Sequence, residues 1–158
     1  VYMGIPLIAI LALRASPQIG FAGLFFLLGV VWLTDIGAYA TGRVIGGPRF
    51  APSISPGKTW AGAFGGLILA VAGGAWGAGF MEPQPPLGAI ALAICLSVAT
   101  QCGDLFESWV KRRFGKKDSG TIVLGHGGIL DRIDGLLFAA PVMAAITFAQ
   151  RGTVPLWP

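Results

Sequence analysis

The stretch IGFAGLFFLLGVVWLTDIGAY, residues 19–39, decides the fold, because it is apolar over almost its whole length. A helix that crosses a hydrocarbon core of about 30 Å needs about 20 such residues. Near its end the stretch carries Thr34, Asp35 and Tyr39. A charged residue within a membrane helix costs about 2.5–3.5 kcal/mol on insertion scales. Asp35 is therefore expected to face a partner or a polar cavity.

The composition of the whole chain also indicates a membrane protein. Of its 158 residues 54% are hydrophobic and only 11% are charged, and the mean hydropathy is +0.75. A soluble domain carries about 25% charged residues. We predict an all-α polytopic membrane protein that forms a single domain over residues 1–158, with about five spans at 1–14, 19–40, 60–80, 87–106 and 134–150. The chain is apolar from Val1 without a signal-peptide pattern, so we expect an N-terminal portion before it.

Two polar stretches, 42–58 and 103–134, separate these spans and contain nine of the eleven Lys and Arg residues. Two spans lie between them, so both are expected on the same side of the membrane. Lys and Arg accumulate in cytoplasmic loops, which predicts that both stretches are cytoplasmic. Prolines at 48, 52 and 56 predict a loop for the first stretch. The glycines of the third span are interpreted as packing positions; they are Gly62, Gly65, Gly66, Gly73 and Gly74.

The second polar stretch, GDLFESWVKRRFGKKDSGTIVLGHGGILDRID, holds most of the ionisable side chains. Asp104 and Glu107 are three residues apart and share a helix face, and Asp131 and Asp134 repeat that spacing at the start of the fifth span. Carboxylates at helix ends against a membrane indicate a Mg²⁺ site, since Mg²⁺ takes oxygen ligands and is usually shared with substrate phosphates. The alternative is a set of surface salt bridges with neighbouring bases.

The bases of this stretch form a cluster that suits phosphate, because Arg binds phosphate bidentately and Lys acts as a point charge. Anchoring to anionic lipid is the alternative, and both can hold. The cluster consists of Lys111, Arg112, Arg113, Lys116 and Lys117. His126 precedes Gly127 and Gly128, whose backbone amides can approach a phosphate closely; a structural role for the histidine is the alternative.

The sequence SISPGKT, residues 53–59, resembles the end of a P-loop but lacks the required first glycine, so we reject that interpretation. What remains is Ser55, Lys58 and Thr59 leading into a helix, a combination that favours a phosphate contact at the helix N-terminus. With a net charge of +4, the expected partners are anionic lipid and nucleotide phosphate, and not nucleic acid.

Several of these motifs together resemble the phosphatidate cytidylyltransferase family, also called CDP-diacylglycerol synthases. The resemblance covers essentially the whole chain. The motifs are Asp35-Ile36-Gly37-Ala38-Tyr39 with Gly42-Arg43, Ser55-Pro56-Gly57-Lys58-Thr59-Trp60, Ser108, Lys111-Arg112, Lys116-Lys117-Asp118, Leu124-Gly125-His126-Gly127-Gly128 and Asp131-Arg132-Ile133-Asp134. Family members typically show Pro where Leu124 or Gly125 stands, and often Glu where Ala61 stands.

The resemblance implies that phosphatidic acid in the bilayer and CTP give CDP-diacylglycerol and pyrophosphate with Mg²⁺ and possible help from a second cation. The implied metal ligands are Asp104, Asp131 and Asp134, with Glu107 a weaker candidate, and Lys111 and His126 complete the catalytic set. The implied substrate-binding residues are Asp35, Tyr39, Ser55, Lys58, Thr59, Ser108, Arg112, Lys116, Lys117, Asp118, Gly127, Gly128 and Arg132. A homodimer is compatible with the family and with the glycine-rich third span. In a bacterium the protein would lie in the inner or plasma membrane.

Two other classes of function stay open on the sequence. One is transfer from CTP to a different lipid phosphate, such as an isoprenoid ether lipid, or the use of CTP as a phosphoryl donor. The other is a non-catalytic ion or lipid transporter whose intramembrane acids serve the transported species.

Overall fold

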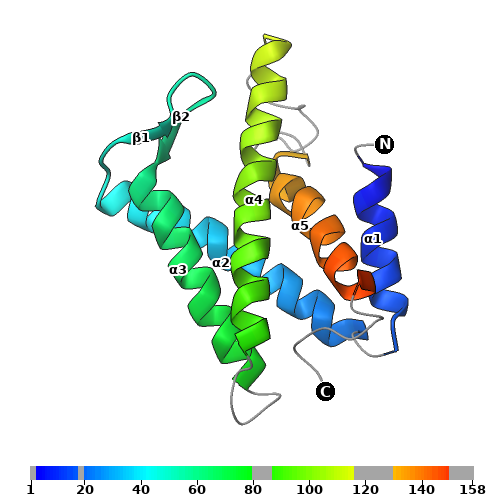
Figure 1. The fold of residues 1–158 in the computed structure, drawn as a ribbon. Coiled ribbons are helices and arrows are strands. Elements are labelled where there is room, and N and C mark those ends of the chain that lie inside the picture. Colours follow the sequence, from blue (N-terminus) through cyan, green and yellow to red (C-terminus); the bar gives the residue numbers. More distant parts are fainter. Residues whose placement is uncertain (1–2, 18–19, 80–86, 116–129, 150–158) are drawn as a thin grey trace.

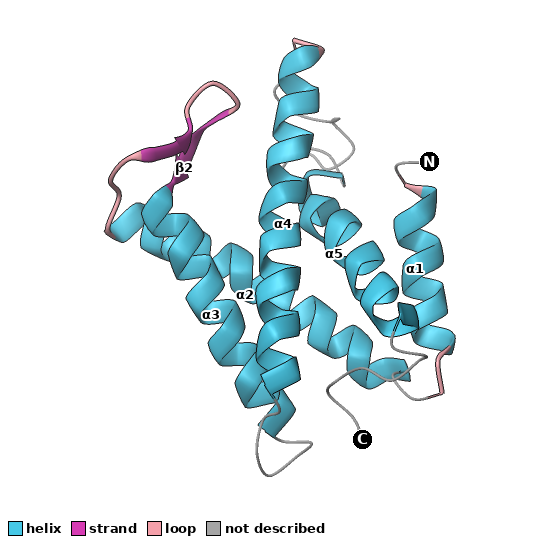
Figure 2. Ribbon diagram, viewed as in Figure 1, coloured by secondary structure: helices cyan, strands magenta, loops and turns pink. Residues whose placement is uncertain are grey.

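The computed structural model describes residues 3–17, 20–79, 87–115 and 130–149, and shows a bundle of helices with one short hairpin (Figures 1 and 2). The helices are α1 (Gly4–Ala15), α2 (Gly20–Val44), α3 (Trp60–Gly79), α4 (Leu87–Arg113) and α5 (Leu130–Ala149). In Figure 1, α4 runs through the centre of the bundle, with α3 on one side and α5 and α1 on the other, while α2 crosses behind it. The helical fold predicted from the sequence is confirmed.

Three of these helices, α2, α3 and α4, are long and apolar enough to cross a membrane. The helix α1 and the Ile133–Ala149 part of α5 are shorter apolar helices. Among the described residues the structure thus supports three membrane-crossing helices and leaves the predicted count of five unconfirmed.

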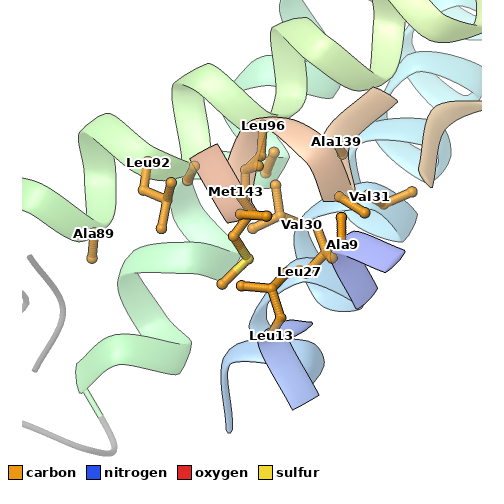
Figure 3. Close-up of a cluster of buried hydrophobic side chains, with 14 of the residues drawn as sticks. Ala9, Leu13, Leu27, Val30, Val31, Ala89, Leu92, Leu96, Ala139 and Met143 are labelled. Atoms are coloured by element: carbon orange, nitrogen blue, oxygen red, sulfur yellow. The ribbon is translucent and has the colours of Figure 1, made fainter. Parts of the chain in front are cut away.

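The hydrophobic core contains residues of all five helices, and its largest buried side chains lie where α1, α2, α4 and α5 meet (Figure 3). Leu13, Leu27, Leu96 and Met143 are fully buried there, one from each of these helices. Each buried side chain of this size contributes about 1.5–3 kcal/mol relative to exposure to water. This core fixes the α4–α5 pair, which carries the predicted acidic ligands.

The helices α2 and α3 pack very closely because glycines line their contact. A Cβ atom on Gly66 would lie 2.6 Å from the Thr34 carbonyl oxygen, and one on Gly37 would lie 2.7 Å from that of Gly65. Further along the same buried stripe of α3, a Cβ on Gly74 would lie 2.9 Å from the Ala93 Cβ of α4. The packing interpretation of the third-span glycines is confirmed. Their contacts lie within the chain, so they give no support to a homodimer.

The first polar stretch departs from the predicted loop. Helix α2 continues to Val44, and two antiparallel strands follow, β1 (Arg49–Ala51) and β2 (Ser55–Thr59), with Arg49 opposite Thr59 and Ala51 opposite Ser55. The Phe50 and Trp60 rings pack edge to face, with centroids 4.5 Å apart. Prolines do exclude a helix here, as predicted, but they are compatible with edge strands, and the aromatic contact stabilises the hairpin.

The predicted boundary of the fourth span, residue 106, is short of the observed end of α4. The helix continues to Arg113, so Lys111 and Arg112 lie on helix and not in a loop, and Glu107 shares the helix with Asp104 as predicted. Lys111 donates to Glu107 Oε2 at 3.3 Å, an i,i+4 pair that supports the added turn. Basic residues in a last turn also interact favourably with the helix dipole.

Candidate active site

A cavity of about 450 Å³ opens between the hairpin and the ends of α2, α3, α4 and α5. Four separate elements contribute charged side chains to it: Asp35 from α2, Lys58 from β2, Asp104 from α4 and Asp134 from α5. Its full lining is Asp35, Ala38, Tyr39, Gly42, Arg43, Phe50, Gly57, Lys58, Thr59, Gly62, Ala63, Gln101, Asp104, Leu105 and Asp134. The fold therefore gathers acids and bases from both polar stretches around one space.

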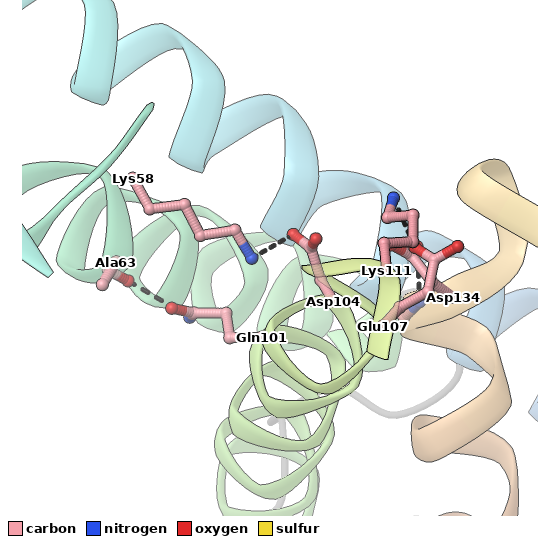
Figure 4. A network of polar contacts seen from close by, with 8 residues as sticks. Lys58, Ala63, Gln101, Asp104, Glu107, Lys111 and Asp134 are labelled. Carbon is pink, nitrogen blue, oxygen red and sulfur yellow. Dashed lines mark hydrogen bonds and ion pairs between the residues drawn. The ribbon is translucent and has the colours of Figure 1, made fainter. Parts of the chain in front are cut away.

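Asp104 lies at the centre of the charges in this cavity. Its Oδ2 atom forms an ion pair with the Lys58 ammonium at 2.5 Å (Figure 4). Asp35 and Asp134 are both close enough to Asp104 to experience repulsion from its charge. Three carboxylates outnumber the two bases of the lining, Lys58 and Arg43, so the cavity favours an added cation.

A second charged group lies beside the cavity, where α4 meets the start of α5. Glu107 is 3% exposed, forms an ion pair with Lys111 and interacts with the Asp134 side chain. Figure 4 shows the three side chains gathered on the far side of Asp104 from Lys58. Glu107 and Lys111 therefore reach the cavity through Asp134 and do not line it.

The hairpin is fixed over the cavity by contacts at both of its ends. At its tip, Arg112 Nε donates to the Ile54 carbonyl oxygen at 3.3 Å. At its base, the Gly62 N–H donates to Thr59 Oγ1 at 3.1 Å, so Thr59 caps the N-terminus of α3. Lys58 precedes this cap directly, and its backbone is thereby held in place at the cavity wall.

Six residues predicted for the site line the cavity: Asp35, Tyr39, Lys58, Thr59, Asp104 and Asp134. Five described residues that were predicted do not line it: Ser55 and Ser108, whose roles stay predictions, Glu107 and Lys111, which pair with each other, and Arg112, which contacts the hairpin tip. The predictions for Lys116, Lys117, Asp118, His126, Gly127 and Gly128 lie outside the described residues. Asp131 and Arg132 fall within α5, but their side chains are likewise not described.

Two polar residues of the cavity were missed as site residues. Gln101 donates to the Ala63 carbonyl oxygen at 3.2 Å, and Arg43 donates to the Tyr39 hydroxyl oxygen at 3.0 Å. Both stand at helical spacing from a predicted residue, Gln101 three before Asp104 and Arg43 four after Tyr39. That spacing on a shared helix face was the signal that could have found them.

The carboxylates suit Mg²⁺ although no compact cluster is preformed. Within the described part of the chain, no three Asp, Glu, His or Cys side chains are close enough together to hold a metal ion. Mg²⁺ is usually bound through one or two carboxylates together with substrate phosphates and water. Asp104 and Asp134, which repel each other across one cavity, fit that mode of binding.

Fold and site together define a helical membrane-type protein with a cavity at one end of its bundle, and three carboxylates line this cavity. The model of the cytidylyltransferase family matches residues 1–149, and the chain belongs to this family.

Curated relatives carry a more specific name. The chain is 50% identical over 142 residues to the phosphatidate cytidylyltransferase of Brucella suis, covering 90% of this chain and 53% of the relative. It is 39% identical over 144 residues to that of Bacillus subtilis, covering 90% and 54%, and 43% identical over 125 residues to that of Staphylococcus epidermidis, covering 78% and 48%. The chain thus spans about half the length of the curated relatives it matches.

Proposed function

We propose that the chain forms the catalytic region of an enzyme that makes CDP-diacylglycerol and pyrophosphate from CTP and phosphatidic acid. The observation that carries the proposal is the cavity, in which four elements bring three carboxylates and a lysine together. The names of the relatives supply the substrate class. In a bacterial cell we expect an integral protein of the inner or plasma membrane with about five spans and with the cavity end in the cytoplasm.

The reaction joins two polyanions, which repel each other. An oxygen of the phosphatidate phosphate attacks the α-phosphorus of CTP, and the bond from that phosphorus to the bridging oxygen of the β-phosphate breaks. The electron pair of the broken bond leaves with pyrophosphate. A bound Mg²⁺ supplies neutralisation of the triphosphate and alignment of the in-line displacement.

The residues of the chain hold and orient the reactants in this scheme. Asp104 and Asp134 hold the cation, with Asp131 as a further ligand and Glu107 positioning Asp134. Lys58 binds a substrate phosphate next to the N-terminus of α3, where the helix dipole favours negative charge. Arg43, with its guanidinium held by Tyr39, offers bidentate binding to a second phosphate.

The remaining predicted roles are part of the same proposal. Lys111, Arg112, Lys116, Lys117 and Arg132 form the basic surroundings of the triphosphate and pyrophosphate, and His126 with Gly127 and Gly128 forms a turn against a phosphate. Ser55, Ser108 and Asp118 support substrate binding. A second cation and a homodimer are extensions that the cavity described here does not require.

The test is an assay of the purified protein with CTP labelled at the α-phosphorus and a panel of lipid acceptors. We expect label in a CDP-lipid, with release of pyrophosphate, when phosphatidic acid and Mg²⁺ are present. An isoprenoid ether lipid phosphate and diacylglycerol serve as alternative acceptors. A phosphorylated lipid together with free CDP would contradict nucleotidyl transfer. Ion or lipid flux into liposomes without consumption of CTP would favour a transporter.

A further inference from the structure

We propose that Lys58 is a displaceable counter-cation for Asp104: it neutralises this carboxylate while the site is empty, and moves to the nucleotide phosphates when a divalent cation takes its place. The inference rests on the proposed function. It assigns two successive partners to Lys58, first the Asp104 carboxylate and then a nucleotide phosphate. Its basis is the 2.5 Å ion pair between Lys58 Nζ and Asp104 Oδ2 across the cavity.

Two other described bases near the cavity have different partners. Arg43 donates to the Tyr39 hydroxyl oxygen, and Lys111 pairs with Glu107. Lys58 is therefore the base that pairs with Asp104 in the described part of the chain. A metal ion that uses Asp104 as a ligand must compete with the Lys58 ammonium for the same carboxylate.

The ion pair is weak enough to exchange. The Lys58 side chain is 26% exposed and that of Asp104 36% exposed, and ion pairs with this access to water contribute little to stability. A divalent cation carries twice the charge of the ammonium group and binds the carboxylate oxygen directly. Displacement is therefore expected once Mg²⁺ is bound, and phosphate ligands should add to it.

The ion pair is not what holds the hairpin in place. The Arg112–Ile54 contact fixes its tip, the Phe50–Trp60 ring contact fixes its base, and the Trp60 N–H donates to the Pro48 carbonyl oxygen at 3.1 Å. The lysine backbone can stay where it is while the flexible four-carbon stem moves the ammonium group. A phosphate placed between Lys58 and the N-terminus of α3 would receive that group.

The first test measures binding of Mg²⁺ alone, without nucleotide, by titration calorimetry on the detergent-purified protein. Lys58→Met removes the competing charge and keeps the side-chain length, so we expect Mg²⁺ to bind three- to tenfold more tightly than to the wild type. Lys58→Arg keeps the charge and should stay within twofold of the wild type. Arg43→Gln, the matched control, removes a charge from the same cavity but leaves the Asp104 ion pair intact, and should also stay within twofold.

A second titration uses a CTP analogue with a methylene group between the α- and β-phosphorus, at saturating Mg²⁺. Lys58→Met should bind it at least tenfold more weakly than the wild type. Opposite effects of one substitution on metal and on nucleotide are the signature of exchange, because a merely structural lysine would change both in the same direction. Equal or weaker Mg²⁺ binding by Lys58→Met, or no Mg²⁺ binding by any of the proteins, would overturn the proposal.

A measurement on the wild type covers the case in which Lys58→Met does not fold. Acetic anhydride labels lysines according to their accessibility, and mass spectrometry gives the rate at each site. Mg²⁺ alone should accelerate labelling of Lys58 relative to Lys111, and Mg²⁺ with the CTP analogue should slow it again. An unchanged Lys58 rate would refute the exchange. The measurements with Mg²⁺ alone contain no nucleotide, so their result tests the exchange even if the wild type makes no CDP-lipid. Absence of CDP-lipid would contradict the proposed function and not the exchange.

Discussion

Asp104 combines two roles that depend on the same negative charge. It pairs with Lys58, and in the proposed reaction it holds the cation. Removing its charge relieves repulsion with Asp35 and Asp134. The stability of the protein and its activity are therefore expected to respond in opposite directions to a neutral substitution.

Asp104→Asn should lower turnover by about 10²–10³-fold, since the stabilisation of transition-state charge by a metal is worth several kcal/mol. The midpoint of thermal unfolding should stay the same or rise, because a like charge leaves the cavity. The rate of CDP-lipid formation and an unfolding curve in detergent measure the two effects. Glu82→Gln, at an acid outside both polar stretches, is the matched control and should leave turnover within twofold. Near-normal turnover in Asp104→Asn would rule out its role as a ligand.

Some of the residues that line the cavity could be predicted, because charge in an apolar chain is costly and therefore informative. Asp35 within a membrane-type helix and Asp134 at the start of the fifth span were both identified on that ground, and both line the cavity. The pairing of Lys58 with Asp104 could not be predicted. It joins a strand and a helix that are far apart in the sequence, so only the packing of the elements brings the two charges together.

At the scale of elements, hydropathy locates helices well but not their ends. The apolar character of the fourth span ends before Glu107, whereas α4 continues to Arg113 because the Glu107–Lys111 pair and the basic last turn stabilise a polar extension. The hairpin was missed for a different reason. Strands of three and five residues are too short for an alternating pattern, and the Phe50–Trp60 contact that stabilises them depends on the fold.

The close approach of α2 and α3 gives a prediction for the glycines of α3. Gly66→Ala places a Cβ atom 2.6 Å from the Thr34 carbonyl oxygen, so the helices must separate, at a cost of about 1–3 kcal/mol. Gly77→Ala, the matched control in the same helix, meets nothing within 4 Å and should stabilise the helix by about 0.5–1 kcal/mol. Thermal unfolding in detergent should therefore shift in opposite directions. A shift of the same sign and size in both variants would show that the α2–α3 contact is not tight.

At the scale of the whole molecule, the two polar stretches meet at one end of the bundle. The hairpin, the C-terminal end of α4 and the start of α5 lie together in Figure 1, with the cavity between them. The C-terminal end of α3 lies at the opposite end. This arrangement agrees with the charge distribution in the sequence, in which the two polar stretches carry most of the bases. A membrane crossed by α3 and α4 would therefore separate the cavity from the end of α3.

This arrangement predicts which positions react on each side of the membrane. In a background with Cys95→Ser and Cys102→Ser, a single Ser53→Cys at the hairpin or Arg113→Cys at the end of α4 should react with a membrane-impermeant maleimide in inverted vesicles only. Gly79→Cys at the far end of α3 should react in right-side-out vesicles only, because Lys and Arg are retained in the cytoplasm. All three positions are exposed, so absence of labelling from one side reports the membrane and not burial. If the hairpin and α4 positions were labelled from opposite sides, Lys58 and Asp104 would lie on different sides of the membrane, which would exclude the cavity. If both were labelled from the outside, the cavity could exist but CTP from the cytoplasm would not reach it.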